Sequence, residues 1–116
     1  MHLPKYQQQA IRLTPAEVQA ICDVFVEMVG AVPASLWLFG SRVDTEKRGG
    51  DIDLFLELAG SVDNVAALVR KIRVALYDRI GERKIDLVIK TPATPASALH
   101  EIARQEGVLL WENPQI

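Results

Sequence analysis

Two acids at the start of an apolar strand constrain this chain more than any other feature of its sequence. Residues 49–58 have the sequence GGDIDLFLEL, in which Asp51 and Asp53 are two positions apart. Side chains two apart point to the same face of a β-strand, so the apolar residues at the alternating positions share the opposite face. The pattern predicts a sheet that packs helices on one face and carries paired acids at one end of the other.

A third acid, Asp86, has the same setting. It lies in KIDLVI, residues 84–89, where apolar residues again alternate with it. If the two strands are neighbours, three carboxylates meet on one patch of the sheet. Carboxylates at close range repel one another, and Mg²⁺ suits such hard oxygen ligands while it keeps positions open for water and phosphate. The three acids therefore predict a metal site.

Helices are expected around this sheet. Thr14 and Glu17 form the sequence signature of a capping box, with a proline at the first helical position between them, and this predicts a helix start. An apolar stripe follows at helical spacing, and Gly30 is expected to end the helix. Two further helices are expected at about residues 64–80, before Gly81, and from a Thr94 cap to about residue 105.

The strands give the fold class. They are expected at residues 35–39, 51–58, 84–89 and 108–111. The connection between the first two is too short for a crossover helix, so they should be antiparallel, whereas the helix before the third allows a parallel pairing. The chain is therefore expected to be an α+β protein, a small mixed β-sheet of three to four strands backed by helices.

Composition limits the class of protein. The chain has 116 residues, 49% hydrophobic and 24% charged. This predicts one globular domain at residues 14–116, after an N-terminal arm at residues 1–13. A net charge of −2 without a basic stripe argues against direct nucleic-acid binding. The modest basic cluster of Arg70, Lys71 and Arg73 is expected to be a solvated helix face.

Several residues are expected to have structural roles or none. Cys22 is the single cysteine, which excludes an intramolecular disulfide, and it lies among apolar residues as a small core side chain would. Glu57 shares the face of the acids but lies about 13 Å beyond Asp53 along the strand. His2 and His100 show no metal-ligand spacing. No apolar run suits a signal peptide or a membrane span, so a cytoplasmic protein is expected.

These motifs together resemble a known family. Gly40-Ser41, nine further residues, Asp51-Ile52-Asp53 and a later strand with Asp86 resemble the polymerase-β-like nucleotidyltransferase superfamily. Within it, the short chain and the ending IARQEGVLLWE, residues 102–112, are similar to the minimal nucleotidyltransferases (MNT). These are small bacterial proteins often encoded beside a helical partner of the HEPN type. The resemblance covers residues 14 to 112.

The resemblance implies a nucleotidyltransferase fold, an activity and the residues that carry it. Gly40, Ser41 and Arg42 would bind the triphosphate of the incoming nucleotide, most simply ATP. Three acids would be catalytic and ligate two magnesium ions, namely Asp51, Asp53 and Asp86. The implied reaction moves AMP to a hydroxyl, and in the antitoxin version that hydroxyl belongs to a tyrosine of a HEPN toxin.

Two other functions stay open on the sequence. One is a non-catalytic module that neutralises its partner by contact. The other is a small-molecule adenylyltransferase of the aminoglycoside type, which usually requires an added helical domain that a dimer or a partner would have to provide here. The base, the acceptor and a homo- or hetero-oligomeric state also stay open.

Overall fold

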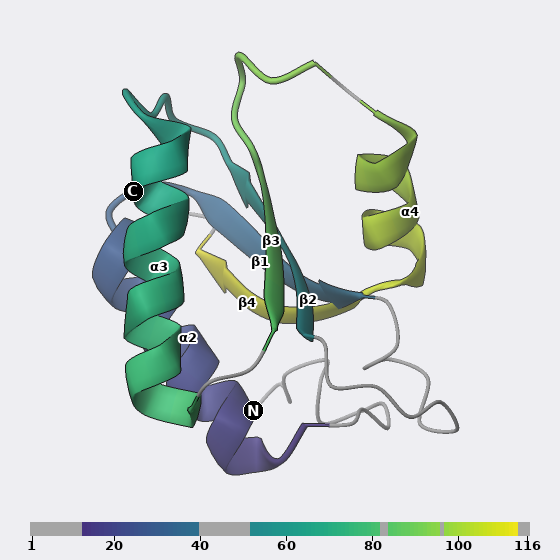
Figure 1. Ribbon diagram of the computed structural model, residues 1–116. Helices are drawn as coiled ribbons and strands as arrows, with labels where there is room; N and C mark the ends of the chain where they lie inside the picture. The colour runs from purple at the N-terminus through teal and green to yellow at the C-terminus, as the bar shows by residue number, and fades with distance from the viewer. Residues whose placement is uncertain (1–12, 40–51, 82–83, 96, 114–116) are drawn as a thin grey trace.

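The computed structural model describes residues 13–39, 52–81, 84–95 and 97–113. Within these ranges, four strands form one sheet and three helices flank it (Figure 1). The elements in chain order are α2 (Pro15–Val29), β1 (Ala34–Phe39), β2 (Ile52–Leu58), α3 (Val65–Ile80), β3 (Ile85–Lys90), α4 (Ala98–Glu106) and β4 (Val108–Asn113).

The sheet has the order β3-β2-β1-β4. β1 is antiparallel to β2 and to β4, while β2 is parallel to β3 across the connection that contains α3. Both predicted pairings are therefore confirmed, and so is the α+β class with a small mixed sheet. The pairing of β1 with β4 shifts register between Leu36 and Trp37.

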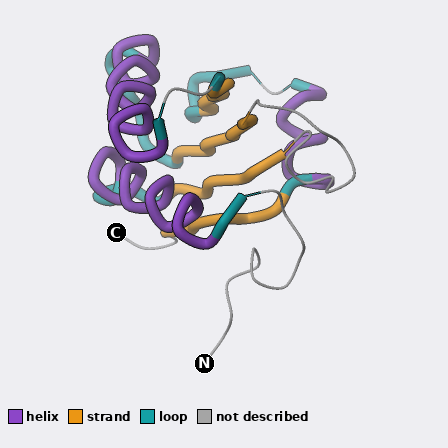
Figure 2. The backbone as a smooth tube through the Cα atoms, turned by 60° about the horizontal axis from the view of Figure 1, so that its bottom comes forward, coloured by secondary structure: helices purple, strands orange, loops and turns teal. Residues whose placement is uncertain are grey.

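The two faces of the sheet are covered differently. α2 and α3 lie against one face and α4 lies on the other (Figures 1 and 2). The alternating apolar residues of the strands pack with α2 and α3 in the main core. Its fully buried members include Ile21, Phe25, Leu36, Leu38, Ile52, Leu54, Leu56, Ile72 and Leu76. The period-two pattern thus places the core on one side of the sheet and the acids on the other.

The predicted ends of α2 and α3 are confirmed. The Glu17 N–H donates to Thr14 Oγ1 at 3.1 Å, and the Thr14 N–H donates to Glu17 Oε1 at 2.9 Å. Leu13, just ahead of this capping box, is buried in the core. Gly30 follows α2, and Gly81 ends α3 with a φ of +85° that favours glycine.

The predicted start of α4 is wrong. Ser97 is its N-cap and accepts a hydrogen bond from the His100 N–H at 3.4 Å. The Thr94 hydroxyl is used instead in a turn, where it accepts from the Thr91 N–H at 3.1 Å. Thr94 and Ser97 both have side chains that cap helices well, and the turn at Thr91 decides between them.

Cys22 lies where the sequence predicted. It is half-buried beside the core, and its thiol donates to the Leu110 carbonyl at 3.6 Å. Burial, assisted by the nearby Asp23 carboxylate, raises the pKa of the Cys22 thiol to about 11. None of the helices in the described ranges combines the length and hydropathy that a membrane span requires.

Candidate active site

Asp53 and Asp86 lie side by side. Each is the second residue of its strand, and the two are register partners in the parallel pairing of β2 with β3. The Ile52 N–H donates to the Lys84 carbonyl at 2.9 Å and continues the strand pairing to this end of the sheet. Neighbouring strands are about 4.8 Å apart, so the Asp53 and Asp86 carboxylates lie close together at one end of the sheet.

Four of the predicted site residues lie outside the described residues. They are Gly40, Ser41, Arg42 and Asp51. The chain connections still bear on them, because Phe39, the last residue of β1, is the register partner of Asp53. Gly40 is next to Phe39 in the chain, and Asp51 is next to Ile52. β1 therefore ends, and β2 begins, at the end of the sheet where the two acids lie.

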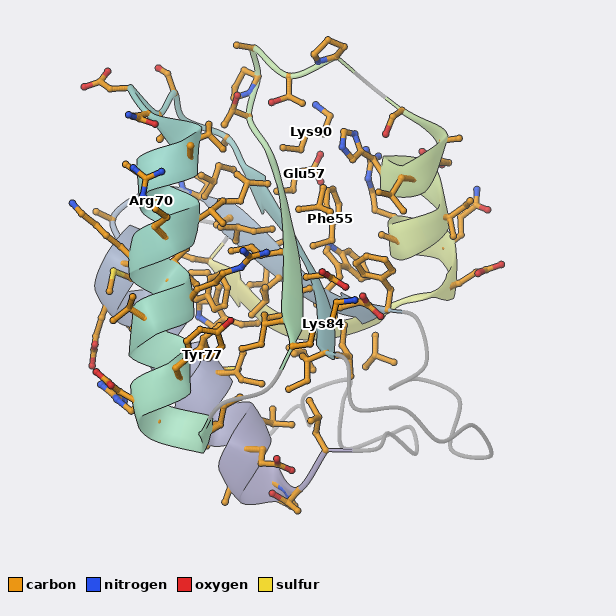
Figure 3. The ribbon with its side chains drawn as sticks, viewed as in Figure 1. Phe55, Glu57, Arg70, Tyr77, Lys84 and Lys90 are labelled. Carbon is orange, nitrogen blue, oxygen red and sulfur yellow. The ribbon has the colours of Figure 1, made fainter. Side chains whose placement is uncertain are left out.

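The face of the sheet that carries the acids is largely aromatic. Trp37 and Phe39 of β1 and Phe55 of β2 alternate with the core positions and so share this face with Asp53. Trp37 is half-buried, and its indole Nε1 is buried without a hydrogen-bond partner in the part of the chain that the structure describes. Figure 3 shows Phe55, Glu57 and Lys90 on the side that faces α4.

α4 is fixed on this face by a ring contact. The His100 imidazole stacks on the Phe55 ring, with centroids 5.2 Å apart and an angle of 17° between the planes. His100 is 5% exposed, although sequence spacing assigned it no partner. No local pattern could have revealed this contact, because β2 and α4 are far apart in the sequence.

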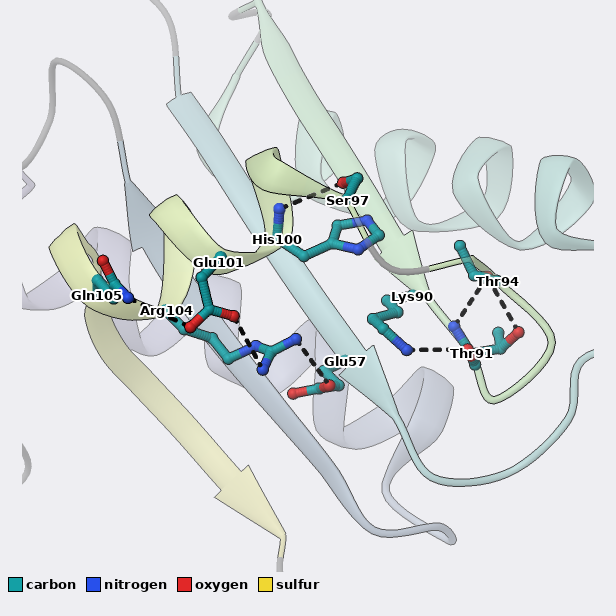
Figure 4. A network of polar contacts seen from close by, with 9 residues as sticks. All are labelled: Glu57, Lys90, Thr91, Thr94, Ser97, His100, Glu101, Arg104 and Gln105. Atoms are coloured by element: carbon teal, nitrogen blue, oxygen red, sulfur yellow. Dashed lines mark hydrogen bonds and ion pairs between the residues drawn. The ribbon is translucent and has the colours of Figure 1, made fainter.

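Glu57 belongs to the attachment of α4 and not to the acid pair. Its carboxylate lies 3.6 Å from an Arg104 guanidinium nitrogen, and Arg104 is also 3.6 Å from Glu101, which accepts from Gln105 (Figure 4). Both Glu57 and Arg104 are about one-third exposed, so the pair contributes little to stability. This geometry agrees with the predicted structural role of Glu57.

A pocket of about 360 Å³ lies at this other end of the strands. Its lining includes Ser35, Glu57, Lys90 and Asn113. Asn113 is held by donating to the carbonyls of Gly30 and Val32 at 2.7 and 3.0 Å. Glu57 lies four positions after Asp53 in β2, which is about 13 Å at strand rise. The pocket is therefore distinct from the acid pair.

The acid pair has suitable donors for a hard cation. Carboxylate oxygens are the ligands that Mg²⁺ prefers, and two aligned carboxylates on adjacent strands can share one ion. Within the described ranges, no group of three or more acidic, histidine or cysteine residues is placed to hold a metal. The third predicted ligand, Asp51, is not among those residues. The roles of Asp53 and Asp86 as metal ligands therefore stay predictions.

Comparison with known proteins places the fold. No family model and no curated protein matches the chain. A crystal structure from Shewanella oneidensis superposes with a TM-score of 0.63 at 15% identity, covering 87% of this chain and 74% of its own. A toxin–antitoxin structure with AMP-PNP gives 0.58 at 21% identity, with coverages of 83% and 73%.

A third structure is the tri-AMPylated HEPN toxin of Shewanella oneidensis in complex with an MNT antitoxin. It gives a TM-score of 0.56 at 21% identity and covers 84% of this chain and 71% of the matched one. At these identities the likeness concerns the fold. The chain therefore shares the α+β fold of these structures, with a small mixed sheet and flanking helices.

Proposed function

We propose that this chain is a metal-dependent nucleotidyltransferase that acts as an antitoxin. It transfers AMP from ATP to a tyrosine hydroxyl of a HEPN-type partner in the cytoplasm and so silences that toxin. The observation that carries the proposal is the alignment of Asp53 with Asp86 at one end of adjacent parallel strands. Acidic side chains that hold magnesium ions recur in sites of phosphoryl transfer.

The acids would act as metal ligands. Asp53 and Asp86, together with Asp51, would hold two magnesium ions. When bound, these ions would lower the pKa of the acceptor hydroxyl and neutralise charge on the departing pyrophosphate. The strands contribute position, because both described acids are fixed by a continuous hydrogen-bonded register and not by a loop.

The nucleotide would lie across the end of the sheet where β1 stops. Gly40, Ser41 and Arg42 would bind the triphosphate: a glycine allows close approach, a serine donates, and an arginine binds phosphate oxygens in a bidentate way. The reaction forms a bond from the acceptor oxygen to the α-phosphorus. The bond from that phosphorus to the oxygen bridging to the β-phosphate breaks, pyrophosphate leaves, and the hydroxyl proton passes to solvent.

The partner protein would supply the acceptor hydroxyl and would shield the reaction from water. Water that reaches the reacting groups would compete with the intended hydroxyl, so a second protein should cover the site. The related fold occurs in an MNT antitoxin complexed with an AMPylated HEPN toxin, and in a toxin–antitoxin structure with AMP-PNP. These neighbours support the proposal that the chain uses an adenine nucleotide and that its partner is a HEPN-type toxin.

The docking surface would include α4. The two tryptophans are poor anchors, because Trp37 and Trp111 are both half-buried and Trp111 packs against the core. The exposed apolar side chains on α4 are Leu99 and Ile102, which are 43% and 47% exposed. They lie one helical turn apart on the same side of the molecule as the acids and suit contact with an apolar helix.

A label-transfer assay tests this proposal. The purified chain is incubated with Mg²⁺, each of the four labelled ribonucleoside triphosphates in turn, and the helical protein encoded by the adjacent gene. The proposal predicts that ATP labels the helical protein and that Asp86→Asn abolishes the labelling. Labelling of a small aminoglycoside by this chain alone would favour the antibiotic-modifying alternative. Tight binding of the helical protein with no labelling at all would favour the contact-only alternative.

A further inference from the structure

The outer face of α2 and α3 has the features of a second contact surface. Among the described residues, four exposed large apolar side chains belong to these two helices: Val26 at 50%, Met28 at 36%, Val74 at 60% and Tyr77 at 37%. A groove of about 400 Å³ runs between the helices, lined by Met28, Arg70, Lys71, Val74, Ala75 and Asp78. α2 and α3 lie on one side of the sheet, while Phe55, which shares the face of Asp53, lies on the side of α4 (Figures 2 and 3).

Charged side chains flank the groove without ion pairs. Arg70, Lys71 and Asp78 are exposed and make no ion pair with any residue that the structure describes. Arg79 differs, because its guanidinium lies 2.8 Å from a Glu27 carboxylate oxygen on α2. The groove therefore has a basic end and an acidic end that make no ion pair within 4 Å among the described residues, although Asp78 also interacts electrostatically with the adjacent Arg79.

These charges are arranged symmetrically along α3. Val74, the most exposed of the apolar residues, stands at the centre. Arg70 and Lys71 precede it by four and three residues, and Asp78 follows it by four. Residues four apart form one ridge on a helix, so Arg70, Val74 and Asp78 give one ridge a basic end, an apolar middle and an acidic end, and Lys71 lies beside its basic end.

We propose that this surface binds a second copy of the same chain, with α3 packed antiparallel on α3 about a twofold axis near Val74. An isologous contact brings the same patch of each subunit against itself in reversed direction. Arg70 and Lys71 of one copy would then face Asp78 of the other, twice over, while the two valines meet at the centre. A wholly acidic partner helix would satisfy the basic end but would place like charges at Asp78.

The dimer should be weak and leave the acid pairs accessible. Stable complexes bury about 800 Å² on each partner, and this patch offers only a few large apolar side chains. The association should therefore depend on concentration. The acid faces of the two subunits would point away from each other, so each could meet its own partner.

Sedimentation velocity of the full chain over a range of protein concentrations tests the dimer. The wild type should show a sedimentation coefficient that rises with concentration. Val74→Asp, which sets two carboxylates against each other at the axis, should remain monomeric. Val74 is 60% exposed, so this change should not affect folding. Ile102→Asp on α4 is the matched control, at 47% exposure, and should dimerise as the wild type does.

A charge-exchange experiment then distinguishes a second copy from any other partner. Asp78→Lys makes both ends of the ridge basic, and the double variant Arg70→Glu, Lys71→Glu makes both ends acidic. Each variant alone should be monomeric, because like charges would meet. An equimolar mixture should form a heterodimer, because both contacts then become complementary. A wild type that stays monomeric at high micromolar concentration, or a mixture that does not associate, would overturn the proposal.

Discussion

The His100 imidazole and the Phe55 ring stack at a centroid distance of 5.2 Å and hold α4 against the face of the sheet that carries the acids. His100→Ala should lower the free energy of unfolding by about 1–3 kcal/mol, because it removes a buried ring contact and leaves a cavity. Urea denaturation measures the change. His100→Phe is the control: since His100 Nδ1 has no hydrogen-bond partner among the described residues, an apolar ring there should preserve stability. An alanine variant as stable as the wild type would contradict the importance of the stack.

Gly81 should be sensitive to substitution for a purely conformational reason. Its φ of +85° and ψ of 176° lie in a region that is almost restricted to glycine, and a Cβ there would meet nothing within 4 Å. Gly81→Ala should therefore cost about 1–3 kcal/mol of stability through backbone strain alone. Gly60→Ala is the matched control, because Gly60 has no positive φ and its Cβ would lie 3.5 Å from Val32. Equal thermal midpoints for Gly81→Ala and Gly60→Ala would contradict the explanation by backbone strain at Gly81.

The Cys22 thiol should react slowly and affect stability only at high pH. With the pKa raised from 9.0 to about 11, its thiolate fraction at neutral pH falls about a hundredfold, and alkylation by iodoacetamide should slow accordingly. Because the folded pKa is the higher one, the contribution of this group to stability is complete below pH 9 and declines toward pH 11. Cys22→Ala should show a smaller loss of stability over that interval. A native-state alkylation rate equal to that of the unfolded chain would contradict the burial.

The two acids should weaken the fold when no cation is present. Asp86→Asn removes one of two adjacent carboxylates, so stability measured with a chelator should stay equal or rise as repulsion is relieved. Glu57→Gln serves as the control, because it breaks the partly exposed pair with Arg104 and should change stability by no more than about 1 kcal/mol. A clear loss of stability in Asp86→Asn would mean that this carboxylate has a structural role.

Much of the fold could be predicted because it follows from local chemistry. The alternation of acids and apolar residues in β2 and β3 fixed which face of each strand is buried, and the length of the connecting helix fixed their parallel pairing. The capping box at Thr14 is equally local. The start of α4 was missed because Thr94 and Ser97 are chemically similar caps, and a tertiary turn uses the first.

The contacts of α4 could not be predicted for a different reason. The stack of His100 on Phe55 and the pairing of Arg104 with Glu57 join residues more than forty positions apart. Sequence periodicity identifies a buried face but not which side chain of another element meets it. For the candidate site, the alignment of Asp53 with Asp86 follows from strand pairing, whereas the roles of Gly40, Ser41, Arg42 and Asp51 stay predictions from the resemblance.

The most direct measurement is intact-protein mass spectrometry of this chain co-expressed with the helical protein of HEPN type that is proposed as its partner. The account predicts that the helical protein carries one or more adenylyl groups, mapped to tyrosine by peptide sequencing. The adduct should be absent from pairs with Asp53→Asn and present in pairs with Glu57→Gln. An adduct of undiminished amount in the Asp53→Asn pair, or an unmodified helical protein bound to the wild type, would contradict adenylyl transfer at the Asp53–Asp86 site.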